Sequence, residues 1–446
     1  MLRKFGILIL ALCALDAQAR VDASQAARLG NDLTPLGAER AGNAEGTIPE
    51  WTGGVKAPAG YQRGMHHPDP YAADEPAYVV DAGNLAAYAE RLPVGIRELI
   101  ARTPGYHLRV YPTRRSAAAP QRIYDATREN ATRANLIAGG NGIEGAYAGI
   151  PFPIPKEGLE VIWNHIVHYK GDQIHIINNQ AVVQANGSYS LIKRDRYIYY
   201  FYNREGMTLK DLDNTLLYYK YKVLAPAKIA GNALVVQDTL DQILATRKVW
   251  RYNRSDRRVR RLPSLAYDSV QPDTDGLATA DVVDTYNGAP DRYEWTLIGK
   301  REMLVPYNSY AVHQQGIPYD RIVQAKALNP DLLRYELHRV WIVEAELRPS
   351  FRHPYAKRRF YVDEDSWQIL AVDLYNDNGE LIGLQESHPI SYYELPVFAS
   401  TLETLYDFKS GRYFVDGLDN NEPMYDYEVP LSPRDFTPQA LRRDGN

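Results

Sequence analysis

The feature that most constrains the fold is a run of strand-like segments that begins at residue 173 and is interrupted only by short links. Four segments are rich in β-branched and aromatic residues and contain few breakers, at 173–185, 189–202, 215–223 and 234–240. Links as short as the one at Asn186-Gly187 leave no room for a crossover helix. The sequence therefore predicts a meander of antiparallel strands.

Aromatic residues fall on both faces of this predicted sheet. In the second segment Tyr197, Tyr199 and Phe201 point one way, whereas Tyr200 and Tyr202 point the other. The chain has 34 Tyr against 9 Phe, and a ring with a polar tip suits a wall that is apolar on one side and wet on the other. The abundance of strands is an equally good explanation. Because both faces must be covered, we expect helices on one face and a ligand or partner on the other.

A basic hairpin extends the meander at 246–262. It carries eight Arg or Lys between Arg247 and Arg261 and a single acid, Asp256, although the whole chain has a net charge of −4. Two explanations stay open. The cations either pair with strand carboxylates such as Asp238 and Asp241, or they contact an acidic partner or anionic lipid headgroups. The negative net charge argues against nucleic acid as a partner.

The rest of the chain adds helices and further strands. Periodicity and breakers predict helices at 84–91, 94–102, 121–138 and 158–169, and strands at 293–298, 302–304, 333–347, 355–362, 367–376 and 381–393. We expect residues 20–400 to form one domain, with an extended N-terminal segment anchored by Trp51. Residues 401–446 are polar and contain several prolines, which predicts a C-terminal extension on the surface.

Residues 1–19 have the pattern of a secretory signal. A basic start precedes an apolar run from Phe5 to Leu15, and a small-residue cleavage site ends at Ala19. The apolar run is much shorter than the roughly 20 residues that span a bilayer. We predict cleavage after Ala19 and a periplasmic protein. Cleavage also removes Cys13, the single cysteine, so neither a disulfide nor a thiolate nucleophile is expected.

Two motifs carry a resemblance to a known family. The first is GNAEGTIPEWTGG at 42–54, and the second combines WRYN at 250–253, RRVRRLP at 257–263 and AYD at 266–268. Together they resemble the signature of the bacterial envelope family called domain of unknown function 1329, and the similarity extends over nearly the whole mature chain. That family is similar in turn to the periplasmic lipoprotein-sorting carriers.

The resemblance implies a fold, a function and partners. The fold is an α+β architecture in which a large curved antiparallel β-sheet, an incomplete β-barrel, has helices covering its concave face over an apolar cavity. The implied function is a periplasmic carrier of a hydrophobic or lipid-like ligand, with no enzymatic activity and no cofactor. The implied partners are an exporter of the resistance-nodulation-division type or an outer-membrane barrel protein, with transient membrane contact. A scaffold that bridges these membrane proteins without carrying a ligand is the alternative.

Candidate site residues come from three places. An irregular Gly- and Pro-rich loop at 139–155 and the following helix offer apolar side chains for the lip or lid of a cavity, and the basic hairpin offers aromatic ones. The candidate ligand-binding residues are Ile150, Phe152, Trp163, Trp250 and Tyr252. The candidate contacts to an anionic surface or partner are Arg258 and Arg260.

The sequence also lacks the common motifs of enzymes and metal sites. The sequence has no Gly-x-Ser-x-Gly elbow, phosphate loop, dinucleotide fingerprint or zinc signature. His66 and His67 are adjacent in a Pro-rich loop, and His165 and His168 lack the spacing of a zinc protease, so no metal is expected. A hydrolase that uses two carboxylates is not excluded by sequence, because such pairs have no fixed spacing along a chain.

Overall fold

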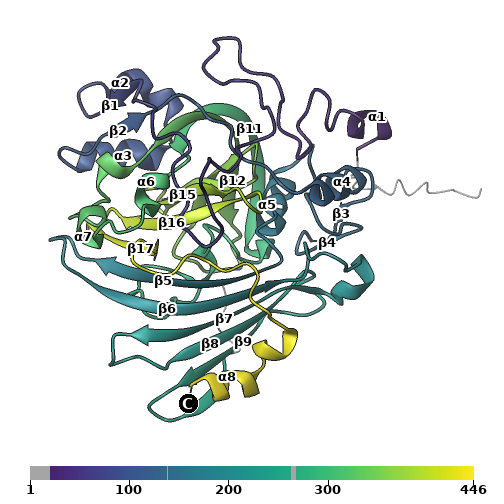
Figure 1. The fold of residues 1–446 in the computed structure, drawn as a ribbon, viewed down its shortest axis with the longest axis vertical. Helices are drawn as coiled ribbons and strands as arrows, with labels where there is room; N and C mark the ends of the chain where they lie inside the picture. Colours follow the sequence, from purple (N-terminus) through teal and green to yellow (C-terminus); the bar gives the residue numbers. More distant parts are fainter. Residues whose placement is uncertain (1–20, 138, 263–267, 446) are drawn as a thin grey trace, which may run out of the picture.

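The computed structural model describes residues 21–137, 139–262 and 268–445 (Figure 1). The predicted signal sequence at 1–19 and its cleavage after Ala19 lie outside these ranges, as do residues 263–267 of the second family motif. Within the described ranges, no helix has both the length and the apolar character that a membrane span requires.

One sheet of fifteen strands dominates the molecule. Its strands are β1 (Tyr78–Val80), β2 (Leu108–Val110), β5 (Gln173–Val183), β6 (Tyr189–Tyr200), β7 (Thr215–Ala225), β8 (Ala233–Thr239), β9 (Lys248–Asn253), β10 (Arg258–Arg261), β11 (Tyr293–Pro306), β12 (Tyr335–Leu347), β13 (Lys357–Asp363), β14 (Ile369–Tyr375), β15 (Leu381–Tyr392), β16 (Val397–Asp407) and β17 (Arg412–Leu418). A separate small ladder pairs β3 (Asn135–Leu136) with β4 (Ile143–Glu144).

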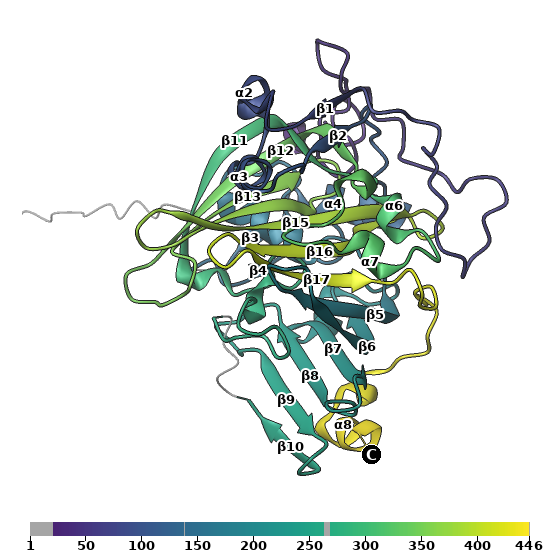
Figure 2. The ribbon, with the colours of Figure 1, turned by 90° about the vertical axis from the view of Figure 1, so that its left-hand side faces the viewer.

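The sheet is mostly antiparallel and does not close on itself. Its strands follow the order β1-β2-β12-β13-β14-β15-β16-β17-β5-β6-β7-β8-β9-β10, and β11 pairs with β12 beside this path. The contact between β2 and β12 is the parallel one among the described pairs. Figure 2 shows the strands fanning around a bend, so that β7 to β10 slant steeply relative to β15 to β17. This is the open, curved sheet that the resemblance implied.

Short helices and turns connect and cover the strands. The α-helices are α1 (Ala23–Ala26), α2 (Leu85–Tyr88), α3 (Val94–Arg102), α4 (Gln121–Asn130), α5 (Gly158–Val167), α6 (Tyr310–His313), α7 (Tyr319–Ile322) and α8 (Pro438–Gly445). The 3-10 helices are η1 (Ala89–Arg91), η2 (Leu209–Leu212), η3 (Ala280–Val282), η4 (Pro290–Arg292), η5 (Pro330–Leu332) and η6 (Pro433–Phe436).

The predicted meander is confirmed as the consecutive antiparallel strands β5 to β10. Two other predictions are wrong in detail. The helix predicted at 121–138 ends at Asn130, and Asn135–Leu136 forms strand β3 instead. The segments predicted as two strands at 293–298 and 302–304 form the single strand β11, which shifts register against β12 at Gly299. Gly299 has a φ of +130°, a conformation that other residues rarely adopt, so the strand continues through a bulge that looks like a break in the sequence.

The prediction for residues 401–446 is wrong over its first part. Most of β16 and all of β17 lie in this range, and β17 pairs with β16 on one side and with β5 on the other. Leu402, Leu405, Tyr413 and Val415 are buried there. The polar and Pro-rich character that suggested a surface tail belongs to residues after 418, where the chain runs along the strands to α8.

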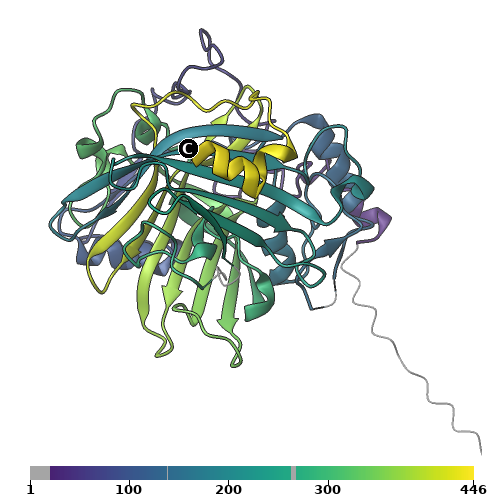
Figure 3. The ribbon, with the colours of Figure 1, turned by 90° about the horizontal axis from the view of Figure 1, so that it is seen from below.

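The two faces of the sheet are covered differently. The outer face packs against α3, which buries Ile96 and Leu99 with Leu384 of β15, and against α8, which contacts β8 and β9. Figure 3 shows the yellow α8 lying across the teal strands. On the inner face, α5 buries Val161 and Ile162 against β12 to β14. The remainder of the inner face faces residues 268–289, which link β10 to β11 and are called the cover segment below.

The N-terminal segment is tied to the body by Trp51, as predicted. Its indole is buried, and Nε1 donates a hydrogen bond of 2.9 Å to the carbonyl of Ala117. Gly54, three residues later, has a φ of +79°, and a Cβ atom there would lie 2.6 Å from the side chain of Ala118. The first family motif therefore lets the backbone approach closely at an anchoring point.

Candidate functional site

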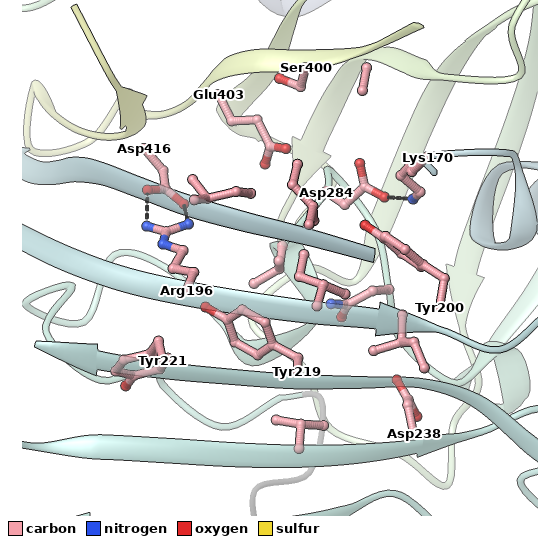
Figure 4. Close-up of a pocket in the computed structure, with 18 of the residues that line it drawn as sticks. Lys170, Arg196, Tyr200, Tyr219, Tyr221, Asp238, Asp284, Ser400, Glu403 and Asp416 are labelled. Carbon is pink, nitrogen blue, oxygen red and sulfur yellow. Dashed lines mark hydrogen bonds and ion pairs between the residues drawn. The ribbon is translucent and has the colours of Figure 1, made fainter. Parts of the chain in front are cut away.

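A cavity of about 260 Å³ lies between the inner face of the sheet and the cover segment. Strands β5 to β9 form one wall, β15 to β17 form another, and the cover segment lies across them (Figure 4). Since one water molecule takes about 30 Å³ in the liquid, the cavity has room for on the order of ten waters. That space also suits one chain-like organic ligand.

The apolar part of the wall is a row of side chains that crosses five neighbouring strands. The register places Ile174 opposite Ile198, Ile198 opposite Tyr219, Tyr219 opposite Val236, and Val236 opposite Val249. Because successive side chains of a strand alternate between faces, all five point to the inner face and line the cavity. The row is a continuous apolar strip from β5 to β9.

The cover segment is held to the sheet by side chains of the inner face. Gln180 of β5 donates to the carbonyl of Asp273 at 3.1 Å, and Gln385 of β15 donates to the carbonyl of Val282 at 3.3 Å. These contacts come from strands on both sides of the bend. The cover is therefore attached across the hollow of the sheet.

Asp284 is the point where the cover meets the end of α5. Lys170 donates to its carboxylate, and His165 of α5 donates from Nε2 to its carbonyl at 2.9 Å. Burial lowers the pKa of His165 to about 4, so the ring is neutral and Nδ1 accepts the N–H of Ile369 at 3.2 Å. Asp284 and Thr285 have φ values of +54° and +59°, and this unfavourable backbone is fixed by the surrounding contacts.

Electrostatics favour the ionised form of Asp284. Burial by itself would raise the pKa of its carboxyl, but Lys170, followed by His165 and His168, holds that pKa below its usual value. The Lys170–Asp284 contact is therefore an ion pair at neutral pH.

Two more ion pairs line the cavity. Arg196 of β6 donates to both oxygens of Asp416 of β17, at 2.8 and 2.5 Å, and Arg247 pairs with Asp238 at 2.5 Å. Burial would raise the pKa of Asp416, but Arg196 outweighs it and the pKa is lowered. The Arg247–Asp238 pair confirms, for one arginine of the basic stretch, the explanation in which these cations pair with strand carboxylates.

Glu403 of β16 is the fourth acid of the cavity wall. It is partly exposed toward the cavity, and Figure 4 shows its carboxyl group pointing inward between Asp416 and Asp284. Among the contacts of the described residues it has no ion pair, and its Oε2 accepts one long hydrogen bond of 3.4 Å from the N–H of Thr285. Burial, followed by the charges of Asp284 and Asp416, raises the pKa of Glu403 to about 8. The carboxyl is thus mainly protonated at neutral pH.

The structure places the loop and helix candidates in the protein core. Phe152 and Trp163 pack in one buried cluster with side chains of β6 to β9, and Ile150 packs with α4 and α5. Trp163 is fully buried, and its Nε1 donates to the carbonyl of Gly140 at 2.8 Å. None of these three side chains lies on the wall of the described cavity.

The hairpin candidates lie away from the cavity as well. Trp250 and Tyr252 of β9 point to the outer face, opposite to Val249, and pack in the cluster that includes α8. Arg258 and Arg260 are exposed on the edge strand β10, so they remain available to a partner, but they do not reach the cavity. The sequence-based candidates therefore fall into a core group and an edge group.

The charged residues of the cavity were missed for two reasons. Glu403 and Asp416 lie in the part of the chain that was predicted as a surface extension. Asp284 lies in an irregular segment whose course over the sheet is not encoded in any local period. The one sequence feature that could have located the cavity wall is the aromatic pattern of β6 and β7. Tyr219 and Tyr221 line the cavity, whereas Tyr199 packs on the outer face.

One group of residues has the composition of a metal site. His338, Asp363 and Asp365 bring possible ligand atoms within 4.8 Å of one another. Arg115, however, donates to both oxygens of Asp365 at 2.7 and 2.9 Å, and Ser366 donates from Oγ to Asp363 at 2.6 Å. Since these carboxylates are already bound by protein donors, the group forms a buried polar network and we assign no metal to it.

Comparison with known proteins gives one relative with clear sequence identity and several solved structures with low identity. The chain is 46% identical over 444 residues to the uncharacterized protein PA3922 of Pseudomonas aeruginosa, which covers 99% of this chain and 97% of the relative. A crystal structure of a DUF1329 family protein from Desulfovibrio piger superimposes with a TM-score of 0.41 at 15% identity, covering 61% of this chain and 92% of that one. The LolA superfamily protein NE2245 from Nitrosomonas europaea gives a TM-score of 0.37 at 12% identity, covering 63% and 98%.

The family model described as Protein of unknown function (DUF1329) matches residues 79–442. This match spans most of the chain and includes the basic hairpin, whose motif carried the resemblance in the sequence. Together with the close relative in Pseudomonas aeruginosa, it shows that the chain belongs to the DUF1329 family.

Proposed function

We propose that this protein binds a hydrophobic or lipid-like ligand in the cavity between the sheet and the cover segment, and carries it through the periplasm. The observation that supports this most is the apolar row from Ile174 to Val249, which lines a cavity of about 260 Å³. Each methylene group that moves from water onto such a wall contributes roughly 0.8 kcal/mol. A chain of eight to ten carbons would gain roughly 6–8 kcal/mol in this way, from which the cost of immobilising the ligand is subtracted.

Release of the ligand would involve the cover segment. Val283 of the cover segment lines the cavity and is 38% exposed, so this part of the cover is not tightly packed against the sheet. Opening there needs the Lys170–Asp284 pair to separate, while the strands of the sheet stay paired. We therefore propose that the cover, and not the sheet, moves when the ligand enters or leaves.

The choice of partner rests on the family resemblance alone. We propose an exporter of the resistance-nodulation-division type or an outer-membrane barrel protein, with this chain as its accessory. The exposed Arg258 and Arg260 on β10 are candidates for that contact or for transient contact with anionic lipid. The rival function is a scaffold that bridges membrane proteins and carries nothing.

Native mass spectrometry separates the carrier from the scaffold. The full chain is isolated from the periplasm without detergent, and any bound molecule is identified after the protein is denatured. A carrier is expected to bring a stoichiometric hydrophobic molecule. Protein without any such molecule, which also fails to bind the neutral fluorescent probe N-phenyl-1-naphthylamine, would favour the scaffold.

Filling the cavity tests its location. Val236 is part of the apolar row and is partly exposed to the cavity, so Val236→Trp should reduce binding of the probe at least tenfold. The matched control is Val79→Trp on the edge strand β1, where the side chain is 42% exposed and far from the cavity wall. Thermal unfolding of both variants confirms that they fold. Equal binding by the two would place the ligand elsewhere.

A further inference from the structure

We infer that the cavity selects amphiphiles that carry a single positive charge, namely hydrophobic chains with an ammonium headgroup, and that Glu403 is the residue that receives this charge. The inference rests on the proposed function, because it names the class of ligand for the same cavity. It comes from the charges that line the wall and from their pairing.

The cavity wall has one acid more than it has bases. Its cationic side chains are Lys170, Arg196 and Arg247, and its carboxylic side chains are Asp238, Asp284, Asp416 and Glu403. Each cation is bound to one of the first three acids. The acid left over in the described wall is Glu403, so a ligand with one positive charge would make the cavity electrically neutral with every carboxylate ionised.

The place of Glu403 supports this role. It lies on the inner face of β16, and the groups that face it are Asp284 and Lys170 from the cover side and Asp416 and Arg196 from the sheet. Burial, followed by the two neighbouring carboxylates, raises the pKa of Glu403 to about 8. A cation bound beside Glu403 would relieve that repulsion and release its proton.

An anionic headgroup finds no comparable partner. Lys170, Arg196 and Arg247 each already contact a carboxylate, so an anion would have to displace an internal acid, which would then remain buried without a counter-charge. An anion would also lie beside four acids. The same wall therefore disfavours fatty acids and phosphate headgroups.

Aromatic rings add to the preference for a cation. Seven tyrosines line the cavity: Tyr200, Tyr219, Tyr221, Tyr286, Tyr392, Tyr425 and Tyr427. Two of them already have an arginine over the ring, because Arg194 lies 4.4 Å from the centre of Tyr221 and Arg358 lies 5.5 Å from that of Tyr286. Aromatic faces of this kind are a common binding site for quaternary ammonium groups.

The test uses probes with the same chain and different charge. Decyltrimethylammonium, decanoate and the uncharged decyl maltoside are titrated into delipidated full-length protein by calorimetry, below their micelle concentrations. We expect the ammonium probe to bind at least tenfold more tightly than decanoate. Glu403→Gln should remove this preference while the affinity for decyl maltoside stays within about twofold.

The matched control is Glu386→Gln. Glu386 is also a buried acid with a pKa raised by burial to about 7, but it lies on the outer face of β15 and is bound by the hydroxyl of Tyr335 at 2.8 Å. This variant should keep the wild-type preference for the ammonium probe. A loss of preference in both variants would mean that general destabilisation, and not the charge of Glu403, causes the effect.

The pH dependence gives an independent readout, because a quaternary ammonium ion does not titrate. Its affinity for the wild type should rise with pH up to about 8 and then level off, as Glu403 loses its proton, whereas Glu403→Gln should show no such rise. Equal binding of the ammonium probe and decanoate, unchanged in Glu403→Gln, would overturn the inference and leave the carrier function standing. Binding of none of the three probes would overturn the proposed function itself.

Discussion

Arg196 of β6 donates two hydrogen bonds to Asp416 of β17 and thereby spans β5, which lies between their two strands. The contact joins residues 220 positions apart in the sequence. It also lies at the bend of the sheet, where the meander β5 to β10 meets the C-terminal strands. The pair therefore holds the two parts of the inner face together and shapes one wall of the cavity.

Arg196→Met should destabilise the protein because it leaves the partly buried Asp416 without its counter-charge. The expected loss is about 3 kcal/mol in the free energy of unfolding, and the additional substitution Asp416→Asn should recover much of it. Urea unfolding measures both values. Arg260→Met is the control, because Arg260 pairs with Asp256 on the exposed edge and its loss should change stability by less than about 0.5 kcal/mol. Equal effects of the two Met variants would contradict this assignment.

Glu403 should make the ligand-free protein less stable as the pH rises. Its pKa is raised from 4.5 to about 8 by burial and by Asp284 and Asp416, so the folded state binds the proton more tightly than the unfolded state. The contribution to stability is fully present below about pH 4.5 and is lost as the pH approaches 8. The stability of Glu403→Gln relative to the wild type should grow across this window and level off above it. Urea midpoints of both proteins between pH 4 and 9 provide the measurement, and a constant difference would refute the shift.

Gly95→Ala should destabilise helix α3 although alanine is the better helix former. A Cβ atom at this position would lie 2.8 Å from Cδ1 of Leu384 and 2.9 Å from Oδ1 of Asp373, which accepts the N–H of Gly95 at 2.7 Å. Overpacking and loss of this bond should outweigh a propensity gain of about 1 kcal/mol, leaving a net loss of about 1–2 kcal/mol. Glu98→Ala in the same helix removes only a surface ion pair with Arg102 and is expected to be nearly neutral. A stabilised Gly95→Ala protein would show that the helix can shift away from β14 and β15.

Phe152→Asp should unfold the protein or reduce its stability by more than about 3 kcal/mol. From the sequence, Phe152 was expected at the lip of the cavity, where the same substitution would lower ligand uptake and leave the fold intact. Its side chain is instead buried with Trp163 in an apolar cluster, where a carboxylate would lose its hydration. Phe152→Leu should keep both the fold and probe binding. A folded Phe152→Asp protein with reduced uptake would restore the original assignment.

The local parts of the fold were predictable. Strands β5 to β9 follow from the period of two in their residues, and the turn between β14 and β15 follows from Asn376 and Gly379, whose φ is +75°. Helix α3 was also placed correctly, since Pro93 and Pro104 flank it. In each case the residues that specify the element lie within or beside it.

The candidate site could not be predicted in the same way, because its parts meet only through long-range pairing. Glu403 reaches the cavity because β17 pairs with β5, a contact between strands that are far apart in the chain. Asp284 reaches it because an irregular segment crosses the inner face. No local pattern distinguishes these acids from surface acids. Trp250 and Tyr252 were predicted to line the cavity but do not. Their register with Val235 and Ala233 turns both side chains toward α8.

The open sheet ends at β10, which has a partner on one side only. A strand in that position leaves backbone donors and acceptors ready to accept another chain, and this is how many β-proteins begin to form fibrils. Here the outermost strand presents Arg258, Arg260 and Arg261 to the solvent. Two molecules that met along this margin would crowd their guanidinium groups together, so the row of like charges disfavours pairing between the edges of two copies.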